Sequence, residues 1–382
     1  MKTKTIPIFL TFLVMGVADA MGPMSDAVKS QYQLTNVIST LLPFFVFIAF
    51  AIFSVPGGLM AARMGKKNLL LLGLGLNVIA MAVPTVVNPG FVLLLLCIFL
   101  LGIGTTLLQV AGNPIMRDVS AEGTYSRNLA LAQGIKGIGS AGSSYLVGLV
   151  LILPLFASMG WRGVIPIFFS FMLIAFIFVA ALKINETKGN VPPSIGSSLS
   201  LLKESVFALA VIGIFLYVGA EASMGRFLKP TLASLGLPPD KAALFGPTFF
   251  FGALTIGRLV AGSINFSARN FFRISSVLGL VGLALVMTKV EAFCTIGVIL
   301  GGLGFANVWP MLFSITVEER PERSSELSGL MCMAISGGAI IPLIMGKLLD
   351  IGMASMSFIV PGICFIYLLL LSLKGEKKQT VL

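Results

Sequence analysis

Long apolar runs, separated by short polar stretches, follow one another along the whole chain. A helix needs roughly 20 mostly apolar residues to cross a bilayer. By this measure the sequence predicts twelve membrane-spanning helices, at residues 6–28, 36–62, 69–87, 91–116, 128–153, 163–183, 205–229, 242–265, 272–289, 292–316, 325–349 and 355–373. Because the connections are short, consecutive helices should run antiparallel. The pattern therefore predicts an all-α membrane protein.

The polar stretch at residues 185–204 is the longest connection and is rich in Pro, Gly and Ser. It separates the predicted helices six and six, as a linker between two halves does. We expect an N-terminal six-helix bundle over residues 1–184, a cytoplasmic linker over 185–204 and a C-terminal six-helix bundle over 205–382. Short matches at a common offset of roughly 200 residues, such as residues 16–22 with 219–225, indicate two pseudo-symmetric repeats.

Lysine and arginine gather on one side of this topology. The side that carries both chain ends also carries Arg63, Lys66 and Lys67 between the second and third helices, and Arg320 and Arg323 between the tenth and eleventh. Cytoplasmic loops carry an excess of these residues, so we expect both termini in the cytoplasm. The formal net charge of +11 is then a topology signal. Because the basic residues form no continuous patch, we expect no nucleic-acid partner.

The composition excludes several classes of protein. Hydrophobic residues make up 57% of the chain and charged residues 11%, with a mean hydropathy of +1.02, whereas soluble domains carry roughly 25% charged residues. The 382 residues include no histidine, which excludes histidine proton relays, histidine metal ligands and Ser-His triads. The four cysteines lie inside apolar segments without CxxC spacing, as small core residues do. We expect no cofactor, no metal ion and no enzymatic activity.

A glycine-rich run at residues 137–142 lies inside a predicted span. It lacks the preceding strand and the Lys-Ser/Thr pair of a nucleotide-binding loop. Close helix packing is the better interpretation, because small residues let helix backbones approach one another. The sequence contains no ATPase motif, so transport would have to follow a gradient or run downhill.

Local motifs add a family resemblance. Residues 58–67 (Gly-Leu-Met-Ala-Ala-Arg-Met-Gly-Lys-Lys) resemble the cytoplasmic G-x-L-a-D-R-x-G-r-k loop of the major facilitator superfamily, with Ala62 in place of the usual acidic residue. A fainter version follows at residues 257–262. The resemblance implies the fold of that superfamily, with twelve transmembrane helices in two pseudo-symmetric six-helix bundles, and we expect a monomer.

Within the superfamily the chain most resembles the fucose–galactose–glucose:proton symporters. The resemblance rests on Asp19 with Pro23, residues 109–114 (Gln-Val-Ala-Gly-Asn-Pro), residues 131–134 (Leu-Ala-Gln-Gly) and residues 217–228, which begin Tyr-Val-Gly-Ala-Glu. It implies a proton-coupled monosaccharide importer of the bacterial inner membrane. Two positions depart from the family: Gln109 stands where its best-known members have glutamate, and Lys136 stands where asparagine is usual. These departures leave the substrate and the coupling ion open.

Two charged residues inside the predicted spans are candidates for proton coupling, because an ionisable group at mid-membrane costs several kcal/mol unless it is paired or hydrated. Asp19 is expected to take up and release the proton and to contact the substrate; a structural ion pair or a helix-end position is the alternative. Lys136 is expected to pair with Asp19 in a cavity until Asp19 is protonated or substrate binds. It could instead attract a sugar-acid carboxylate, or extend along the lipid towards the cytoplasm.

Amide side chains are the candidates for binding a sugar. Gln109 and Asn113 are one helical turn apart, and Gln133 and Lys136 are three residues apart, so each pair shares a helix face. Amides both donate and accept hydrogen bonds, which suits sugar hydroxyls. The alternative is hydrogen bonding between helices, which is common in membrane bundles.

The second half contributes three further candidates. Glu221 is expected to line the cavity, and its spacing of five residues from Arg226 does not favour an ion pair along a regular helix. Asn307 and Trp309, just before a proline, are expected to bind hydroxyls and to stack on a sugar ring; a packed kink is the alternative. The charges of residues 318–323 are expected either to form salt bridges between the two halves that hold an inner gate shut in the outward-open state, or to remain a solvated loop.

Other functions remain open on the sequence alone. An efflux pump for apolar or cationic compounds fits the Met- and Phe-rich spans, although Lys136 and the amide pairs argue against it. A sugar-acid transporter or a uniporter would use Lys136 directly. A receptor or scaffold without transport is disfavoured, because it has little use for polar residues along several spans.

Overall fold

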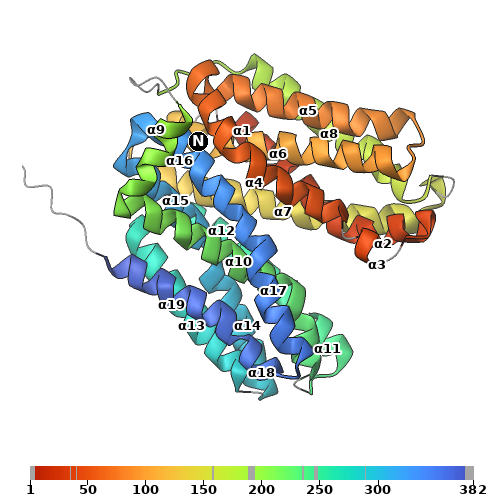
Figure 1. Cartoon of the computed structure of the whole chain (residues 1–382), viewed down its shortest axis with the longest axis vertical. Helices are drawn as coiled ribbons and strands as arrows, with labels where there is room; N and C mark the ends of the chain where they lie inside the picture. Colours follow the sequence, from red (N-terminus) through yellow and green to blue (C-terminus); the bar gives the residue numbers. More distant parts are fainter. Residues whose placement is uncertain are drawn as a thin grey trace, which may run out of the picture. The chain divides into compact units, whose positions relative to one another are not determined.

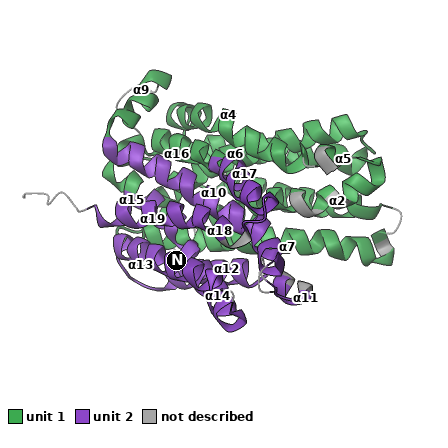
Figure 2. Ribbon diagram, turned by 60° about the horizontal axis from the view of Figure 1, so that its bottom comes forward, with its two compact units in different colours: residues 1–204, 316–336 green, residues 205–315, 337–382 purple. Residues whose placement is uncertain are grey.

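The computed structural model of the chain describes residues 5–34, 36–39, 41–156, 159–187, 194–234, 236–244, 248–288 and 290–374. Within these residues the chain consists of helices and their connections, without a strand (Figure 1). It forms two compact units: unit 1 comprises residues 1–204 and 316–336, and unit 2 comprises residues 205–315 and 337–382 (Figure 2).

Unit 1 contains the first six predicted spans. Its helices are α1 (Thr5–Met15), η1 (Gly16–Ala20), α2 (Met21–Tyr32), α3 (Asn36–Ser39), α4 (Leu41–Met64), α5 (Lys66–Val86), α6 (Phe91–Val119), α7 (Tyr125–Ile152), η2 (Pro154–Phe156), η3 (Gly160–Val164), α8 (Ile165–Ala181), α9 (Ile195–Ser200), η4 (Leu201–Lys203), η6 (Pro321–Arg323), α16 (Ser324–Met333) and η7 (Ala334–Ser336). Glycines bring α4 and α16 together: a β-carbon on Gly58 would lie 2.7 Å from the Ser325 carbonyl oxygen, and one on Gly329 would lie 2.8 Å from that of Ser54. Such small-residue contacts are how membrane helices approach closely.

Unit 2 contains most of the later spans. Its helices are α10 (Ser205–Ser234), α11 (Pro239–Ala243), α12 (Phe249–Ser263), α13 (Ala268–Met287), α14 (Glu291–Ala306), the first part of α15 (Val308–Glu319), α17 (Gly337–Asp350), α18 (Ala354–Ser357) and α19 (Ile359–Leu373). Glycines again bring backbones together, since a β-carbon on Gly297 would lie 2.7 Å from the Gly282 carbonyl oxygen between α13 and α14. Asn307, with φ −108° and ψ 0°, separates α14 from α15.

Large apolar side chains are exposed along the helices of both units. Val92, Leu343 and Leu370 are 71%, 68% and 61% exposed. Extensive apolar surface is rare on soluble monomers but is required where helices face lipid. The chain is therefore a multi-pass membrane protein.

The predicted spans are confirmed as helices, with ends shifted by a few residues. Among the described residues nine helices are long and apolar enough to cross a membrane, and the shorter apolar helices Thr5–Ala20, Phe249–Ser263 and Ile359–Leu373 complete the expected twelve. Residues 188–193 of the expected linker lie outside the described residues. The division into two six-helix halves at residues 185–204 stays a prediction. The two compact units do not show whether the halves are repeats of one another.

Candidate functional site

Asp19 lies in η1, the short turn that interrupts the first span, and contacts α7. Its exposed carboxylate accepts a hydrogen bond of 2.5 Å from the Ser140 hydroxyl. Two glycines bring the backbones together here: a β-carbon on Gly16 would overlap the backbone of Gly139 and Ser140, and one on Gly139 would overlap the Leu13 carbonyl. These glycines serve helix packing, as expected of the run at residues 137–142, and they hold Asp19 against α7.

Lys136 lies one turn before Ser140 on α7 and reaches α6. Its Nζ donates to Gln109 Oε1 at 3.3 Å, and among the described residues the half-buried side chain takes part in no salt bridge. The expected ion pair with Asp19 is thus not formed in this structure. The Ser140 hydroxyl contacts the Asp19 carboxylate and also donates to the backbone carbonyl of Lys136.

The three candidate amides of unit 1 meet at Asn113. Its Oδ1 accepts from Gln109 Nε2 at 3.4 Å and from Gln133 Nε2 at 3.3 Å, and its Nδ2 faces the Cys332 sulfur at 3.9 Å. All three amides are almost fully buried. The predicted grouping of Gln109, Asn113, Gln133 and Lys136 is therefore present, and the amides join α6 to α7 directly. Their contact with a substrate stays a prediction.

Glu221 lies halfway along α10 and is paired within unit 2. Its Oε1 lies 3.4 Å from Nη2 of Arg258, on α12. Arg258 is 7% exposed and also donates to the Tyr217 hydroxyl at 3.1 Å and to the Ala306 carbonyl at 3.0 Å. A guanidinium group has several donors in fixed directions, so one arginine can bond all three acceptors.

Arg258 was not among the residues expected at the site. Residues 257–262 resemble a faint copy of the loop motif, whereas the structure places Arg258 in a buried polar network. A signal was available, because a charged residue inside an apolar helix needs a partner. Arg226 lies over the ring of Phe227, 5.5 Å from its centroid, and forms no salt bridge with Glu221 among the described residues, as its spacing indicated.

Asn307 and Trp309 flank the start of α15 and are both about 95% buried. Asn307 Nδ2 donates to the Gly257 carbonyl at 3.3 Å, and the Trp309 ring stacks on Phe313 with centroids 5.9 Å apart. Two polar atoms, Asn307 Oδ1 and Trp309 Nε1, have no hydrogen-bond partner within the described part of the chain. Because buried polar atoms are normally bonded, this acceptor and this donor require an explanation.

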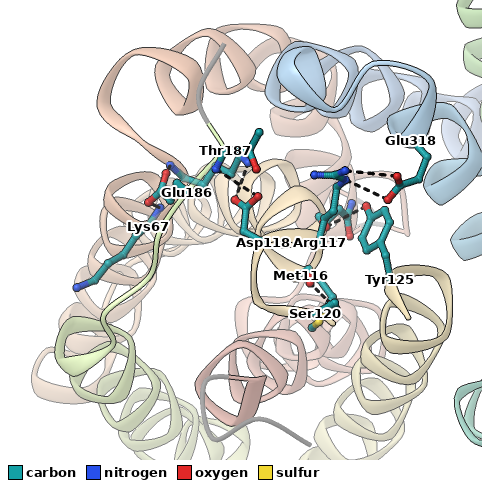
Figure 3. A network of polar contacts seen from close by, with 11 residues as sticks. Lys67, Met116, Arg117, Asp118, Ser120, Tyr125, Glu186, Thr187 and Glu318 are labelled. Atoms are coloured by element: carbon teal, nitrogen blue, oxygen red, sulfur yellow. Dashed lines mark hydrogen bonds and ion pairs between the residues drawn. The ribbon is translucent and has the colours of Figure 1, made fainter. Parts of the chain in front are cut away.

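Lys66 and Lys67 of the loop motif are held by acidic residues from other parts of the chain, and Figure 3 shows Glu186 beside Lys67. Glu186 accepts from the backbone N–H groups of Lys66 at 2.6 Å and Lys67 at 2.9 Å, where α5 begins with free donors. Asp118 of α6 accepts from Lys66 Nζ at 2.6 Å. The motif is thus tied into unit 1 even though Ala62 replaces its usual acidic residue.

The charges of residues 318–323 form salt bridges, which was one of the two expectations. The pairs are Arg117 with Glu318 at 3.0 Å (Figure 3), Arg320 with Glu204 at 2.9 Å and Arg323 with Glu326 at 2.8 Å. Glu326 also accepts from the hydroxyls of Ser197 and Ser198 on α9, both at 3.1 Å. A role for these contacts in an inner gate stays a prediction.

Comparison with known proteins assigns the family. The sequence model of the Major Facilitator Superfamily matches residues 8–264. The chain belongs to this superfamily. A glucose/galactose transporter of Brucella abortus (strain 2308) is 29% identical over 371 residues, which cover 91% of this chain and 88% of the relative. An L-fucose-proton symporter of Escherichia coli (strain K12) is 23% identical, covering 90% and 86%.

A solved structure of the superfamily has the same fold. The transporter FucP, in the outward conformation, matches with a TM-score of 0.82 over 97% of this chain and 98% of that chain, at 19% identity. The predicted superfamily fold is thereby confirmed. As a member of the Major Facilitator Superfamily, the chain is a membrane transporter.

Proposed function

We propose that the chain is a secondary active transporter that takes up a monosaccharide or sugar derivative together with a proton. The named relatives transport glucose and galactose, or L-fucose with a proton, and they match nearly the whole chain. The protein would act as a monomer in the bacterial inner membrane, with both termini in the cytoplasm and its substrate chemically unchanged. Alternating access about a central site is the mechanism that suits two bundles of this kind.

The observation that carries the proposal is the polar cluster of unit 1. Within a membrane bundle it holds one carboxylate, Asp19, and one ammonium group, Lys136, beside neutral amides. Protonation of Asp19 would remove a charge whose burial is costly, so the proton would favour closure of the site. The amides would exchange their mutual hydrogen bonds for sugar hydroxyls, at which they can both donate and accept.

Unit 2 contains polar atoms of its own that could bind a sugar. Trp309 Nε1 is a buried donor and Asn307 Oδ1 a buried acceptor, and neither has a partner among the described residues. A hydroxyl group donates one hydrogen bond and accepts others, so a sugar could satisfy both atoms. This supports the predicted sugar-binding roles of Asn307 and Trp309. Glu221, already paired with Arg258, would position this side of the site.

Uptake by the purified protein in proteoliposomes tests the proposal. With an inward-directed proton gradient, we expect radiolabelled glucose, galactose, fucose or one of their derivatives to accumulate, and collapse of the gradient to abolish accumulation. Asp19→Asn should lose gradient-driven accumulation but retain substrate exchange between the two sides. Asp240→Asn, at an exposed carboxylate of α11, is the matched control and should behave as wild type. Efflux of dyes without uptake of any sugar or derivative would contradict the proposal.

A further inference from the structure

Lys136 carries a positive charge that takes part in no salt bridge with the described side chains. Its ammonium group donates to the neutral Gln109 amide at 3.3 Å, and no carboxylate of the described residues lies within salt-bridge distance. The Asp19 carboxylate is bonded to Ser140 instead. Asn113, Gln133 and the Cys332 thiol complete the cluster and are neutral groups.

Among the described side chains, the other charges on the elements packed against α7 lie near the ends of those elements. They are Lys29 on α2, Arg117 and Asp118 on α6, Arg127 on α7 and Arg162 on η3. Arg117 and Asp118 are already paired with Glu318 and Lys66. Asp26 also lies on α2, and its side chain is outside the described residues. Among the described side chains, the charge inside the cluster is therefore set by Asp19 and Lys136.

We propose that the substrate supplies a negative charge to Lys136 when Asp19 is protonated, and that this transporter carries a sugar acid whose carboxylate binds Lys136. This inference rests on the proposed function, in which Asp19 carries the coupling proton. A monocarboxylate matches a single ammonium group. A dianionic phosphate ester would exceed it and be repelled by Asp19, and an amino sugar would be repelled by Lys136.

The same two charges give a rule for coupling. With Asp19 ionised and no substrate, the cluster is neutral, because the carboxylate and the ammonium group cancel. With Asp19 protonated and a sugar acid bound to Lys136, it is neutral again. Substrate alone would leave one negative charge and a proton alone one positive charge, and a net charge is costly to enclose in a membrane bundle. The transporter therefore changes between its outward-open and inward-open states with both proton and acid bound, or with neither. Uptake of the acid anion together with the proton moves no net charge.

The test uses the full-length protein in proteoliposomes with radiolabelled glucuronate and galacturonate, and with the matching neutral sugars glucose and galactose. We expect each acid to enter at least tenfold faster than its neutral counterpart. An inward proton gradient, with the membrane potential clamped at zero, should drive accumulation of the acid. An interior-negative potential without a pH gradient should not.

Substitutions of Lys136 distinguish the effect of its charge on uptake from an effect on folding. Lys136→Asn should lower acid uptake tenfold or more. Any rise in its uptake of neutral sugars over wild type should be less than tenfold. Lys136→Arg should retain acid uptake. Lys347→Asn, at an exposed lysine of α17, should leave it unchanged. Equal melting temperatures of the purified variants would show that the loss is not unfolding.

Two outcomes distinguish this inference from the proposed function. If neutral sugars enter faster than the acids, or if a membrane potential alone drives acid accumulation, the inference is overturned and proton-coupled sugar uptake stands. If neither neutral sugars nor sugar acids enter, both the inference and the proposed function fail.

Discussion

The Ser328 hydroxyl donates to the Val110 carbonyl at 2.7 Å, and this carbonyl is the one that Pro114 leaves without its helical donor. In an α-helix each carbonyl accepts from the N–H group four residues later, and proline has none to give. The hydroxyl, from α16, thus replaces a missing bond inside α6. Both groups are fully buried, so without Ser328 the carbonyl would lack a partner.

In unit 2 a proline also leaves a helical carbonyl without its backbone donor, and a different kind of side chain bonds that carbonyl. Pro310 in α15 leaves the Ala306 carbonyl without its donor, and Arg258 of α12 donates to that carbonyl at 3.0 Å. The two prolines lie at matching places in the pseudo-repeat suggested by the sequence. In each unit a side chain from another helix therefore replaces the backbone hydrogen bond that the proline removes. The replacement bond ties that helix to the helix that contains the proline.

Ser328→Ala should destabilise the protein by about 1–3 kcal/mol, the cost of leaving one buried carbonyl unsatisfied. Thermal unfolding of the purified protein in detergent measures the change. The double variant Ser328→Ala with Pro114→Ala should regain most of the loss, because alanine at position 114 restores the backbone donor to Val110. Equal destabilisation of the single and double variants would show that the hydroxyl matters for another reason.

Arg258→Lys should destabilise unit 2 although it preserves the charge. The guanidinium group bonds Glu221, Tyr217 and Ala306 together, and an ammonium group on a shorter stem cannot reach all three in the same geometry. Each buried acceptor left unbonded costs about 1–3 kcal/mol.

Arg226→Lys is the matched control for this substitution. Arg226 is exposed and contacts only the Phe227 ring among the contacts described for it, which an ammonium group also does. Its melting temperature should stay near wild type. If Arg258→Lys proved as stable as this control, the network around Arg258 would not depend on its planar group.

The sequence predicts the helices and the bundle plan well, because the length of an apolar run sets the length of a span. It also pairs Gln109 with Asn113 and Gln133 with Lys136, since helical spacing decides which side chains share a face. It could not choose partners between helices. Lys136 bonds Gln109 and not Asp19, and that choice depends on how α7 is rotated against α6 and η1, which residue spacing along one helix does not give.

Gly139→Ala should disrupt the packing that presents Asp19. A β-carbon at this position would overlap the Leu13 backbone carbonyl, which cannot move aside as a flexible side chain does. Overpacking costs about 1–3 kcal/mol or more, so we expect a lower melting temperature and loss of uptake. Gly142→Ala, three residues along the same helix, is the control, because nothing lies within 4 Å of its added carbon. Similar losses in both variants would place the effect in α7 itself and not in its contact with α1.

Removing one partner of the salt bridge between Lys66 and Asp118 should destabilise the protein strongly. The side chains are 2% and 0% exposed, and the charged atoms lie 2.6 Å apart. Asp118→Asn leaves the Lys66 ammonium buried without a counter-charge, which costs about 3–5 kcal/mol. Thermal unfolding in detergent should register this as a large fall in melting temperature.

Two further variants separate this buried pair from a surface effect. Lys66→Met combined with Asp118→Leu removes both charges and keeps apolar packing, so the double variant should recover much of the stability that Asp118→Asn loses. Glu204→Gln breaks the exposed salt bridge with Arg320 and should cost about 1 kcal/mol at most, since water already solvates both groups. If Asp118→Asn were no more harmful than Glu204→Gln, the ammonium group of Lys66 would have to find water or another acceptor once Asp118 is neutral.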